Sequence, residues 1–275
     1  MYGKENFMWR IAHIDLQIFV NNHIIYANLQ LLLANLHTGV YNSNNKTKQR
    51  IKRSKIKKCR RNHIMKLQIA LDEVTIEQGL ELCEKVREFI DIIEIGTPFI
   101  IEEGMHAVKA FREKFPEKEI LADAKIMDAG ELEAKTCFDA GADYVTVLGV
   151  TDILTVKSCV EIAKKCGKKV VVDMICVQDV EKRVEELEAV GVTDIAVHTG
   201  VDQQAAGRTP LQDLAQMKAC AKKSLVSVAG GINLQTVDQY MALGADVVIV
   251  GGGIAHAADP SAEAKAIAMK LHKNV

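Results

Sequence analysis

A lysine flanked by two carboxylates is the most chemically suggestive feature of the chain. Asp123, Lys125 and Asp128 occur in the segment Asp-Ala-Lys-Ile-Met-Asp. Neighbouring carboxylates favour the ammonium form of a lysine, whereas a Schiff-base nucleophile must be neutral. Lys125 is therefore better suited to stabilising negative charge on a substrate oxygen. The alternative is a salt-bridge network at the surface. Strand alternation would place Asp123 and Lys125 on one side, with Asp128 in the following loop or helix start.

Other ionisable residues directly follow apolar, strand-like runs. Glu94 and Asp123 would come from neighbouring strands, and two carboxylates with room for water and substrate oxygens suit Mg²⁺. His198 could transfer protons near neutral pH, although a lone histidine at a strand end is often structural. Asp72 and Asp173 end their own apolar runs. If the strands are parallel, all these positions converge on one cleft.

Two glycine loops follow the last two apolar runs. They contain Gly230 and Gly231 in Ala-Gly-Gly-Ile-Asn, and Gly251 and Gly252 in Val-Gly-Gly-Gly-Ile. Glycine permits close backbone approach to a ligand, and these positions in a strand–helix barrel commonly bind phosphate through backbone N–H groups. Tight turns without a ligand are the alternative.

The elements that must position these residues alternate between short Val/Ile-rich runs and amphipathic segments, the pattern of strand–helix units around a parallel sheet. Helices are expected over 76–89, 101–115, 131–140 and 180–190. Asp143, Asp194 and Asp246 recur after glycine stops at spacings of 51 and 52 residues, two strand–helix units. Together with Asp91 they precede strands and are expected to be structural. Eight such apolar runs predict eight strands, and these predict a single (β/α)8 TIM barrel over residues 65–275. The predicted strands are 67–71, 92–95, 120–122, 144–148, 170–172, 195–197, 226–228 and 247–250.

The first 64 residues have a different character. They carry 12 Lys+Arg and 2 acidic residues, whereas the remainder carries 23 and 34. We expect a basic leader that is either disordered or an upstream extension that is not part of the natural protein. No apolar stretch reaches the length of a membrane span, and the seven scattered cysteines fit free thiols in a reducing compartment. A soluble, cytoplasmic protein is predicted.

Taken together, the motifs resemble the orotidine-monophosphate decarboxylase suprafamily over essentially all of 65–275. The resemblance rests on Ala-Leu-Asp72, Glu94-Ile-Gly-Thr-Pro and the Asp-x-Lys-x-x-Asp motif at 123–128. His198-Thr-Gly-x-Asp-x-Gln and the two glycine loops resemble its 3-hexulose-6-phosphate synthase branch. That branch implies a Mg²⁺-dependent, reversible aldol reaction of formaldehyde with D-ribulose 5-phosphate through a 1,2-enediolate.

The resemblance also implies a role for each site residue. Glu94 and Asp123 would be metal ligands, Lys125 would stabilise the enediolate, and Asp72 would position substrate oxygens. His198 would be an acid/base candidate. Asp128 resembles a residue that family homodimers insert into the neighbouring active site. Gly230, Gly231, Gly251 and Gly252 would bind phosphate.

Three other functions are weighed against this one. The 3-keto-L-gulonate-6-phosphate decarboxylase branch tends to have Arg, Thr and Arg where this chain has Val201, Ala229 and Gly252, so it is the second choice. Orotidine-monophosphate decarboxylase itself is metal-free and would not need Glu94 with His198. A non-catalytic barrel whose basic leader binds nucleic acid is the least favoured, so no nucleic-acid or membrane partner is expected.

Overall fold

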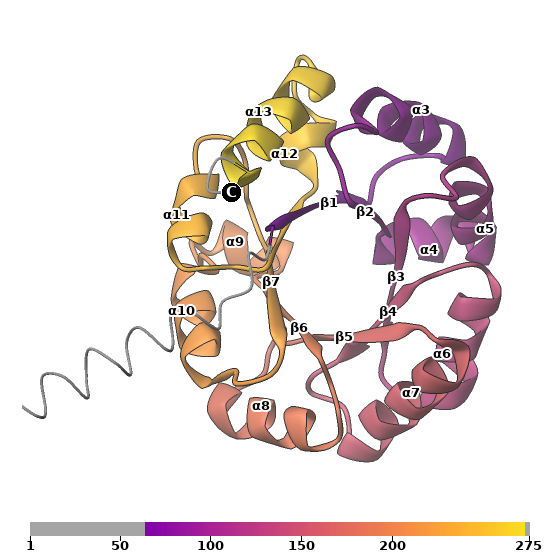
Figure 1. The fold of residues 1–275 in the computed structure, drawn as a ribbon, viewed down its shortest axis with the longest axis vertical. Helices are drawn as coiled ribbons and strands as arrows, with labels where there is room; N and C mark the ends of the chain where they lie inside the picture. Colours follow the sequence, from indigo (N-terminus) through magenta and orange to yellow (C-terminus); the bar gives the residue numbers. More distant parts are fainter. Residues whose placement is uncertain (1–63, 273–275) are drawn as a thin grey trace, which may run out of the picture. The chain divides into compact units, whose positions relative to one another are not determined.

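The computed structural model describes residues 64–272, and the predicted leader, apart from its last residue Ile64, lies outside that range. Eight parallel strands form a closed barrel, in which each strand pairs with the next and β8 pairs with β1. Helices surround the strands (Figure 1), so the predicted (β/α)8 fold is confirmed. The strands are β1 (Lys66–Leu71), β2 (Ile92–Ile95), β3 (Glu119–Ile126), β4 (Tyr144–Leu148), β5 (Lys169–Asp173), β6 (Asp194–His198), β7 (Leu225–Ala229) and β8 (Val247–Val250).

One of the four predicted helices is divided into two in the structure. The single helix expected over 101–115 is wrong, because Gly104 adopts φ 61° and ψ −157° and divides the segment into α4 and α5. Only glycine adopts such a conformation readily. The helices are α3 (Ile76–Val86), α4 (Thr97–Glu103), α5 (Met105–Lys114), α6 (Gly130–Asp139), α7 (Ile153–Cys166), α8 (Val180–Ala189), α9 (Val201–Ala205), α10 (Leu211–Cys220), α11 (Val237–Ala242), α12 (Gly252–Ala255) and α13 (Pro260–His272).

Alternation along the strands separates two layers of side chains. In β1, Leu67, Ile69 and Leu71 are at most 1% exposed and belong to the large core between barrel and helices. Burying one such side chain contributes about 1.5–3 kcal/mol. Gln68 and Ala70 of the same strand line the barrel interior instead. The interior face is therefore free to carry polar groups, while the outer face holds the fold together.

The aspartates that precede strands have the expected structural role in three of four cases. In these three cases the aspartate carboxylate accepts a hydrogen bond from a backbone N–H of the preceding strand, which fixes the start of that preceding strand. Asp194 differs, since it is the first residue of β6 and lines the barrel interior. The three pairs are Asp91 with Leu67 at 2.8 Å, Asp143 with Ile120 at 2.9 Å, and Asp246 with Val226 at 2.8 Å.

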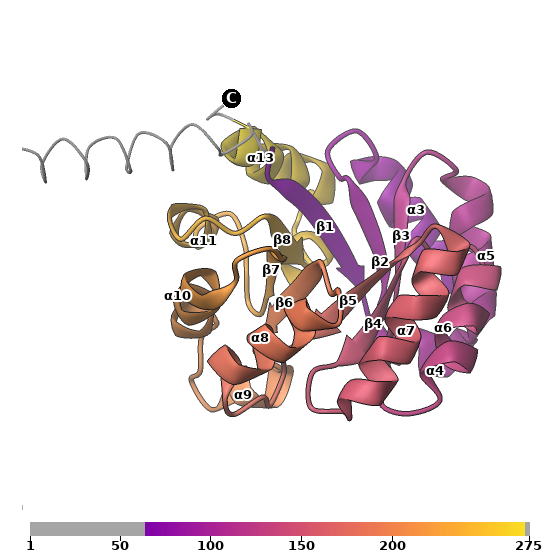
Figure 2. The ribbon, with the colours of Figure 1, turned by 60° about the horizontal axis from the view of Figure 1, so that its bottom comes forward.

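The short helices mark the end of the barrel at which the strands terminate. Helix α4 follows β2 and α9 follows β6, and both lie at the lower end in Figure 2. The strand ends and the loops at this end carry the predicted site residues. Within residues 64–272, no helix has the length and apolar character needed to cross a membrane.

Candidate active site

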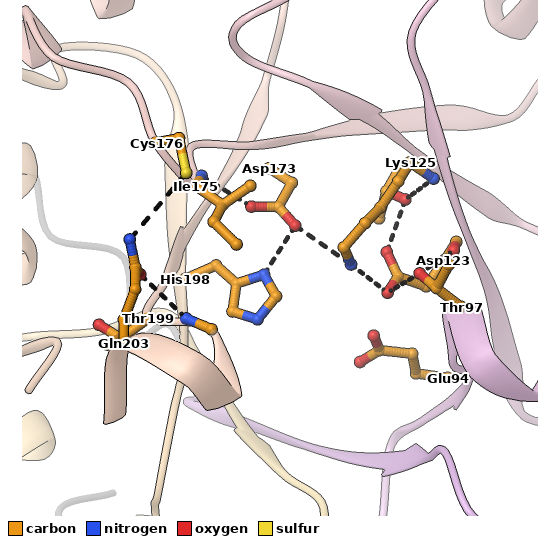
Figure 3. A network of polar contacts seen from close by, with 12 residues as sticks. Glu94, Thr97, Asp123, Lys125, Asp173, Ile175, Cys176, His198, Thr199 and Gln203 are labelled. Carbon is orange, nitrogen blue, oxygen red and sulfur yellow. Dashed lines mark hydrogen bonds and ion pairs between the residues drawn. The ribbon is translucent and has the colours of Figure 1, made fainter. Parts of the chain in front are cut away.

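All predicted site residues except Asp128 line a cavity of about 1310 Å³ within the barrel. Residues from all eight strands or the loops after them line it, so side chains far apart in sequence meet in one place. Figure 3 shows side chains from β2, β3, β5 and β6 pointing toward a common space. The predicted site residues that line the cavity are Asp72, Glu94, Asp123, Lys125, His198, Gly230, Gly231, Gly251 and Gly252.

Lys125 reaches the cavity through an irregularity that strand alternation does not predict. The register between β3 and β4 shifts between Ala122 and Ile126, and Lys125 adopts φ 46°. This left-handed conformation is unusual for a lysine. The N–H of Lys125 donates to Oγ1 of Thr146 on β4 at 2.9 Å, which holds the irregular backbone in place. Both Asp123 and Lys125 thereby face the interior, as expected.

Two threonines fix the carboxylate of Asp123, which is 6% exposed. Thr146 donates to Oδ1 at 2.7 Å, and Thr97 lies 2.8 Å from Oδ2. The ammonium group of Lys125 also contacts Oδ2. Charge-assisted contacts of this kind are stronger than neutral hydrogen bonds, so the orientation of Asp123 is set before any ligand binds.

Asp173 connects the lysine to the histidine. Its Oδ2 lies 3.3 Å from Nζ of Lys125 and 2.8 Å from Nδ1 of His198. Burial raises the pKa of Asp173, but the hydrogen bond and charge of His198, and then the charge of Lys125, outweigh it and lower the pKa. The carboxylate of Asp173 accepts a hydrogen bond from the Nδ1–H of His198, which leaves Nε2 of the imidazole on the cavity side.

The electrostatics keep Lys125 charged. Burial lowers its pKa, but the negative charges of Asp123 and Asp173 outweigh burial and raise the pKa above its ordinary value. The lysine is therefore an ammonium ion in the resting site. This agrees with the sequence-based interpretation of Lys125 as an electrostatic group and not a nucleophile.

Glu94 lies on β2, and its one hydrogen-bond partner among residues 64–272 is Nε2 of Gln68, at 2.6 Å from Oε2 of Glu94. Burial, and then the negative charge of Asp123, raise the pKa of Glu94 to about 8. No three His, Cys, Asp or Glu side chains within residues 64–272 form a complete metal cage. Mg²⁺ is usually held by one or two carboxylates together with water and substrate oxygens, so the pair Glu94 and Asp123 fits this ion.

Asp72 follows β1 and lies against the loop after β2. A Cβ atom added to Gly96 would lie 2.1 Å from Oδ1 of Asp72, so only glycine fits there. Burial, and then the negative charge of Asp123, raise the pKa of Asp72. Oδ2 of Asp72 also faces Gly251, whose added Cβ would lie 4.0 Å from it. Asp72 thus lies between the carboxylate side of the cavity and the second glycine loop.

The two glycine loops lie side by side at the cavity. Gly230 and Gly231 have φ values of 124° and 65°, which other residues adopt only with strain. A Cβ atom on Gly253 would lie 2.4 Å from the carbonyl oxygen of Ile232, so the loops are in close contact. Both loops line the cavity and carry no side chain at these glycines.

Asp128 is the predicted catalytic residue that the structure does not bring into the cavity. It lies in the loop between β3 and α6, its side chain is exposed, and it is absent from the cavity lining. Three functional partners were not singled out from sequence: Thr97, Thr146 and Gln68. They lie within or next to strands and carry ordinary polar side chains, so only the three-dimensional contacts identify them.

The chain belongs to the orotidine 5'-phosphate decarboxylase / HUMPS family, whose model matches residues 65–267. It is 50% identical over 195 residues to a 3-hexulose-6-phosphate synthase of Bacillus subtilis (strain 168), covering 71% of this chain and 93% of the relative. The solved 3-hexulose-6-phosphate synthase from Salmonella typhimurium is 57% identical, with a TM-score of 0.76 over 77% of this chain and all of that one.

A second group of solved structures is similar at lower identity. One is a solved KGPDC (3-keto-L-gulonate-6-phosphate decarboxylase) from Streptococcus mutans. It is 25% identical, with a TM-score of 0.71 over 76% of this chain and 98% of that one. The fold is thus shared by both groups, whereas the sequence is much closer to the synthases.

Proposed function

We propose that this chain is a 3-hexulose-6-phosphate synthase, an aldehyde-lyase that reversibly joins formaldehyde to D-ribulose 5-phosphate. The observation that carries the proposal is 50% identity to a synthase across 93% of that relative's length, together with the convergence of Glu94, Asp123, Lys125 and His198 on one cavity. An aldol reaction needs groups that stabilise an enediolate, and this cavity supplies them.

The reaction begins with loss of a proton from C1 of the sugar, which gives a 1,2-enediolate. C1 then bonds to the formaldehyde carbon, and the former formaldehyde oxygen takes up a proton. The ammonium group of Lys125 offsets the enediolate charge, and Asp72 positions substrate oxygens. His198 is the candidate for moving protons, since its Nδ1 is held by Asp173 and its Nε2 is left for the cavity.

Glu94 and Asp123 are the residues that would hold Mg²⁺. A magnesium ion supplies positive charge beside the enediolate oxygens when it is bound. Burial, and then the negative charge of Asp123, raise the pKa of Glu94, and a bound cation would offset the repulsion between the two carboxylates. We expect EDTA to abolish turnover and Mg²⁺ to restore it. Full activity in the chelated enzyme would contradict this part of the proposal.

Substrate assays separate the synthase from the decarboxylase alternative. We expect formaldehyde-dependent consumption of D-ribulose 5-phosphate and no CO₂ release from 3-keto-L-gulonate 6-phosphate. The opposite pattern would contradict the synthase proposal. The lower identity to KGPDC and the residues Val201, Ala229 and Gly252 disfavour that outcome.

We also propose a homodimer with shared active sites. Asp128 lies outside its own cavity and is surrounded in sequence and fold by exposed apolar side chains. The hydroxyl of Thr151 donates to the carbonyl oxygen of Met127 at 2.5 Å, so the loops after β3 and β4 are joined. A second copy of the chain would cover this surface and receive Asp128. The exposed apolar residues are Met127 (53%), Leu132 (69%), Val150 (44%) and Leu154 (70%).

Mixing two inactive variants tests the shared site. Asp128→Ala and Lys125→Ala subunits would form hybrids with one intact site, so random reassociation should recover about a quarter of the activity. No recovery after confirmed subunit exchange would exclude the shared arrangement.

The free cysteines of the described residues support the predicted cytoplasmic location, because reduced thiols persist there.

A further inference from the structure

The end of the cavity that carries the glycine loops has few charged donors. No lysine or arginine is found among the described residues that line this end of the cavity. These residues are Gly200–Gln204, Ala229–Asn233 and Gly251–Gly253. A phosphate dianion bound there would depend on backbone N–H groups and neutral side chains. Any side-chain amide within reach therefore bears on how strongly the phosphate is recognised.

Gln204 is such a side chain. It is half-buried on the short helix α9, lines the cavity, and packs against the first glycine loop. A Cβ atom added to Gly231 would lie 3.0 Å from Oε1 of Gln204, and one added to Gly230 would lie 3.5 Å from Nε2. The amide is thus in van der Waals reach of both glycines that are expected to present N–H groups to the phosphate.

One contact fixes the orientation of this amide. Nε2 of Gln204 donates to the carbonyl oxygen of Thr199 at 2.7 Å, and Thr199 directly follows His198. Nε2 carries two protons, and the second has no partner among the described residues. The other two amides nearby are occupied differently: Gln203 accepts the N–H of Gly200 at 3.1 Å, and Asn233 accepts the N–H groups of 235 and 236 at 3.0 and 3.1 Å.

We propose that Gln204 is a phosphate-recognition residue: it holds the Gly230–Gly231 loop against the turn after β6 and donates its second Nε2 proton to the substrate's phosphate group. This inference rests on the proposed function and names a residue that determines the preference for a phosphorylated sugar. A neutral donor in a partly buried site can contribute substantially to binding an anion, since hydrogen bonds to charged groups are the stronger kind.

The test compares phosphorylated and unphosphorylated sugars in the full-length protein. Gln204→Leu removes the amide and keeps a side chain of similar size, and Gln212→Leu, at an exposed position of α10 outside the cavity lining, is the control. We expect Gln204→Leu to reduce the ratio of kcat/KM for D-ribulose 5-phosphate to that for D-ribulose by about tenfold to a hundredfold, the value of one hydrogen bond to a charged group. Most of the change should lie in KM. Gln212→Leu should leave this ratio unchanged.

An equal loss with both sugars, or no loss, would overturn the inference, because a merely structural role affects both substrates alike. Calorimetric binding of D-ribulose 5-phosphate and D-ribulose without formaldehyde repeats the comparison independently of turnover. Phosphate-dependent binding that Gln204→Leu weakens, in a protein without synthase activity, would refute the proposed function and support this inference. Synthase activity with an unchanged phosphate preference in Gln204→Leu would support the proposed function and refute this inference.

Discussion

The ammonium group of Lys125 lies 3.3 Å from the carboxylate of Asp173, which comes from a strand two places further around the barrel. The same carboxylate oxygen contacts Nδ1 of His198 at 2.8 Å. One buried oxygen therefore orients both groups to which we assign charge stabilisation and proton transfer. Breaking this connection should impair both functions without removing either residue.

Asp173→Asn removes the shared negative charge and nearly preserves the shape. Its amide cannot hold Nδ1 of His198 and Nζ of Lys125 as an ionised carboxylate does. We expect kcat to fall by about 10- to 100-fold, as for other residues that orient catalytic groups, with a shifted pH–rate profile. Asp152→Asn, at the exposed start of α7, should leave kcat unchanged because Asn is also a good helix cap. An unaltered kcat and pH profile in Asp173→Asn would exclude this positioning role.

The assignment of Lys125 as an electrostatic group makes a prediction that a Schiff-base mechanism does not share. Because Asp123 and Asp173 raise the pKa of Lys125, its amine is not free to attack a carbonyl. Borohydride added with D-ribulose 5-phosphate should leave no adduct on Lys125 by mass spectrometry. Lys125→Ala should still lower kcat by roughly 100- to 1000-fold while the thermal unfolding transition remains cooperative. Trapped substrate on Lys125 would disprove the electrostatic role.

The barrel could be predicted from sequence because its periodic features are local. Buried apolar runs, glycine stops and aspartates before strands recur along the chain, and each signals one strand–helix unit. Asp143 and Asp246 occupy equivalent positions for this reason. The same pattern suggested an equivalent role for Asp194, which instead lines the interior, because β6 begins one residue earlier than the apolar run indicates.

The site could be predicted only in part. Residues at strand ends converge in any parallel barrel, so Glu94, Asp123 and His198 could be grouped without coordinates. The left-handed backbone of Lys125 depends on a hydroxyl from β4, and the junction at Asp173 depends on side chains from three strands. Such contacts join residues far apart in sequence and leave no periodic signal.

Asp143 predicts how stability depends on pH. Burial raises its pKa, but hydrogen bonds from Lys168 and from the N–H of Ile120, and then the charge of Arg112, outweigh burial and lower it below 3.8. The folded state then binds this proton less readily than the unfolded state. The stabilisation is present above about pH 4 and is lost as the pH falls through the folded-state pKa.

We therefore expect Asp143→Asn to lower Tm relative to the unaltered protein at pH 7, and this difference to narrow steadily below pH 4. Thermal unfolding by circular dichroism between pH 3 and pH 7 measures it. Asp139→Asn is the control, because Asp139 forms an exposed pair with Lys135, and such pairs contribute little. A difference in Tm that stays constant down to pH 3 would contradict the assigned role of Asp143.

Gly96 links the packing of the barrel loops to the position of a predicted catalytic carboxylate. Its φ of −65° suits any residue, so backbone strain does not require glycine there. The requirement is space, because an added Cβ would lie 2.1 Å from Oδ1 of Asp72 and 2.5 Å from the carbonyl oxygen of Leu71. Gly96→Ala must therefore displace Asp72 or shift the loop after β2.

We expect Gly96→Ala to reduce kcat/KM by at least about tenfold, since small displacements of positioning groups are costly to catalysis. Gly167→Ala is the matched control: its φ of 67° makes alanine strained, but its added Cβ has no neighbour within 4 Å. That strain should cost about 1–2 kcal/mol of stability and leave kcat/KM unchanged. If Gly96→Ala retained full activity, the position of Asp72 against this loop would not matter to the reaction, and its substrate-positioning role would have to be abandoned.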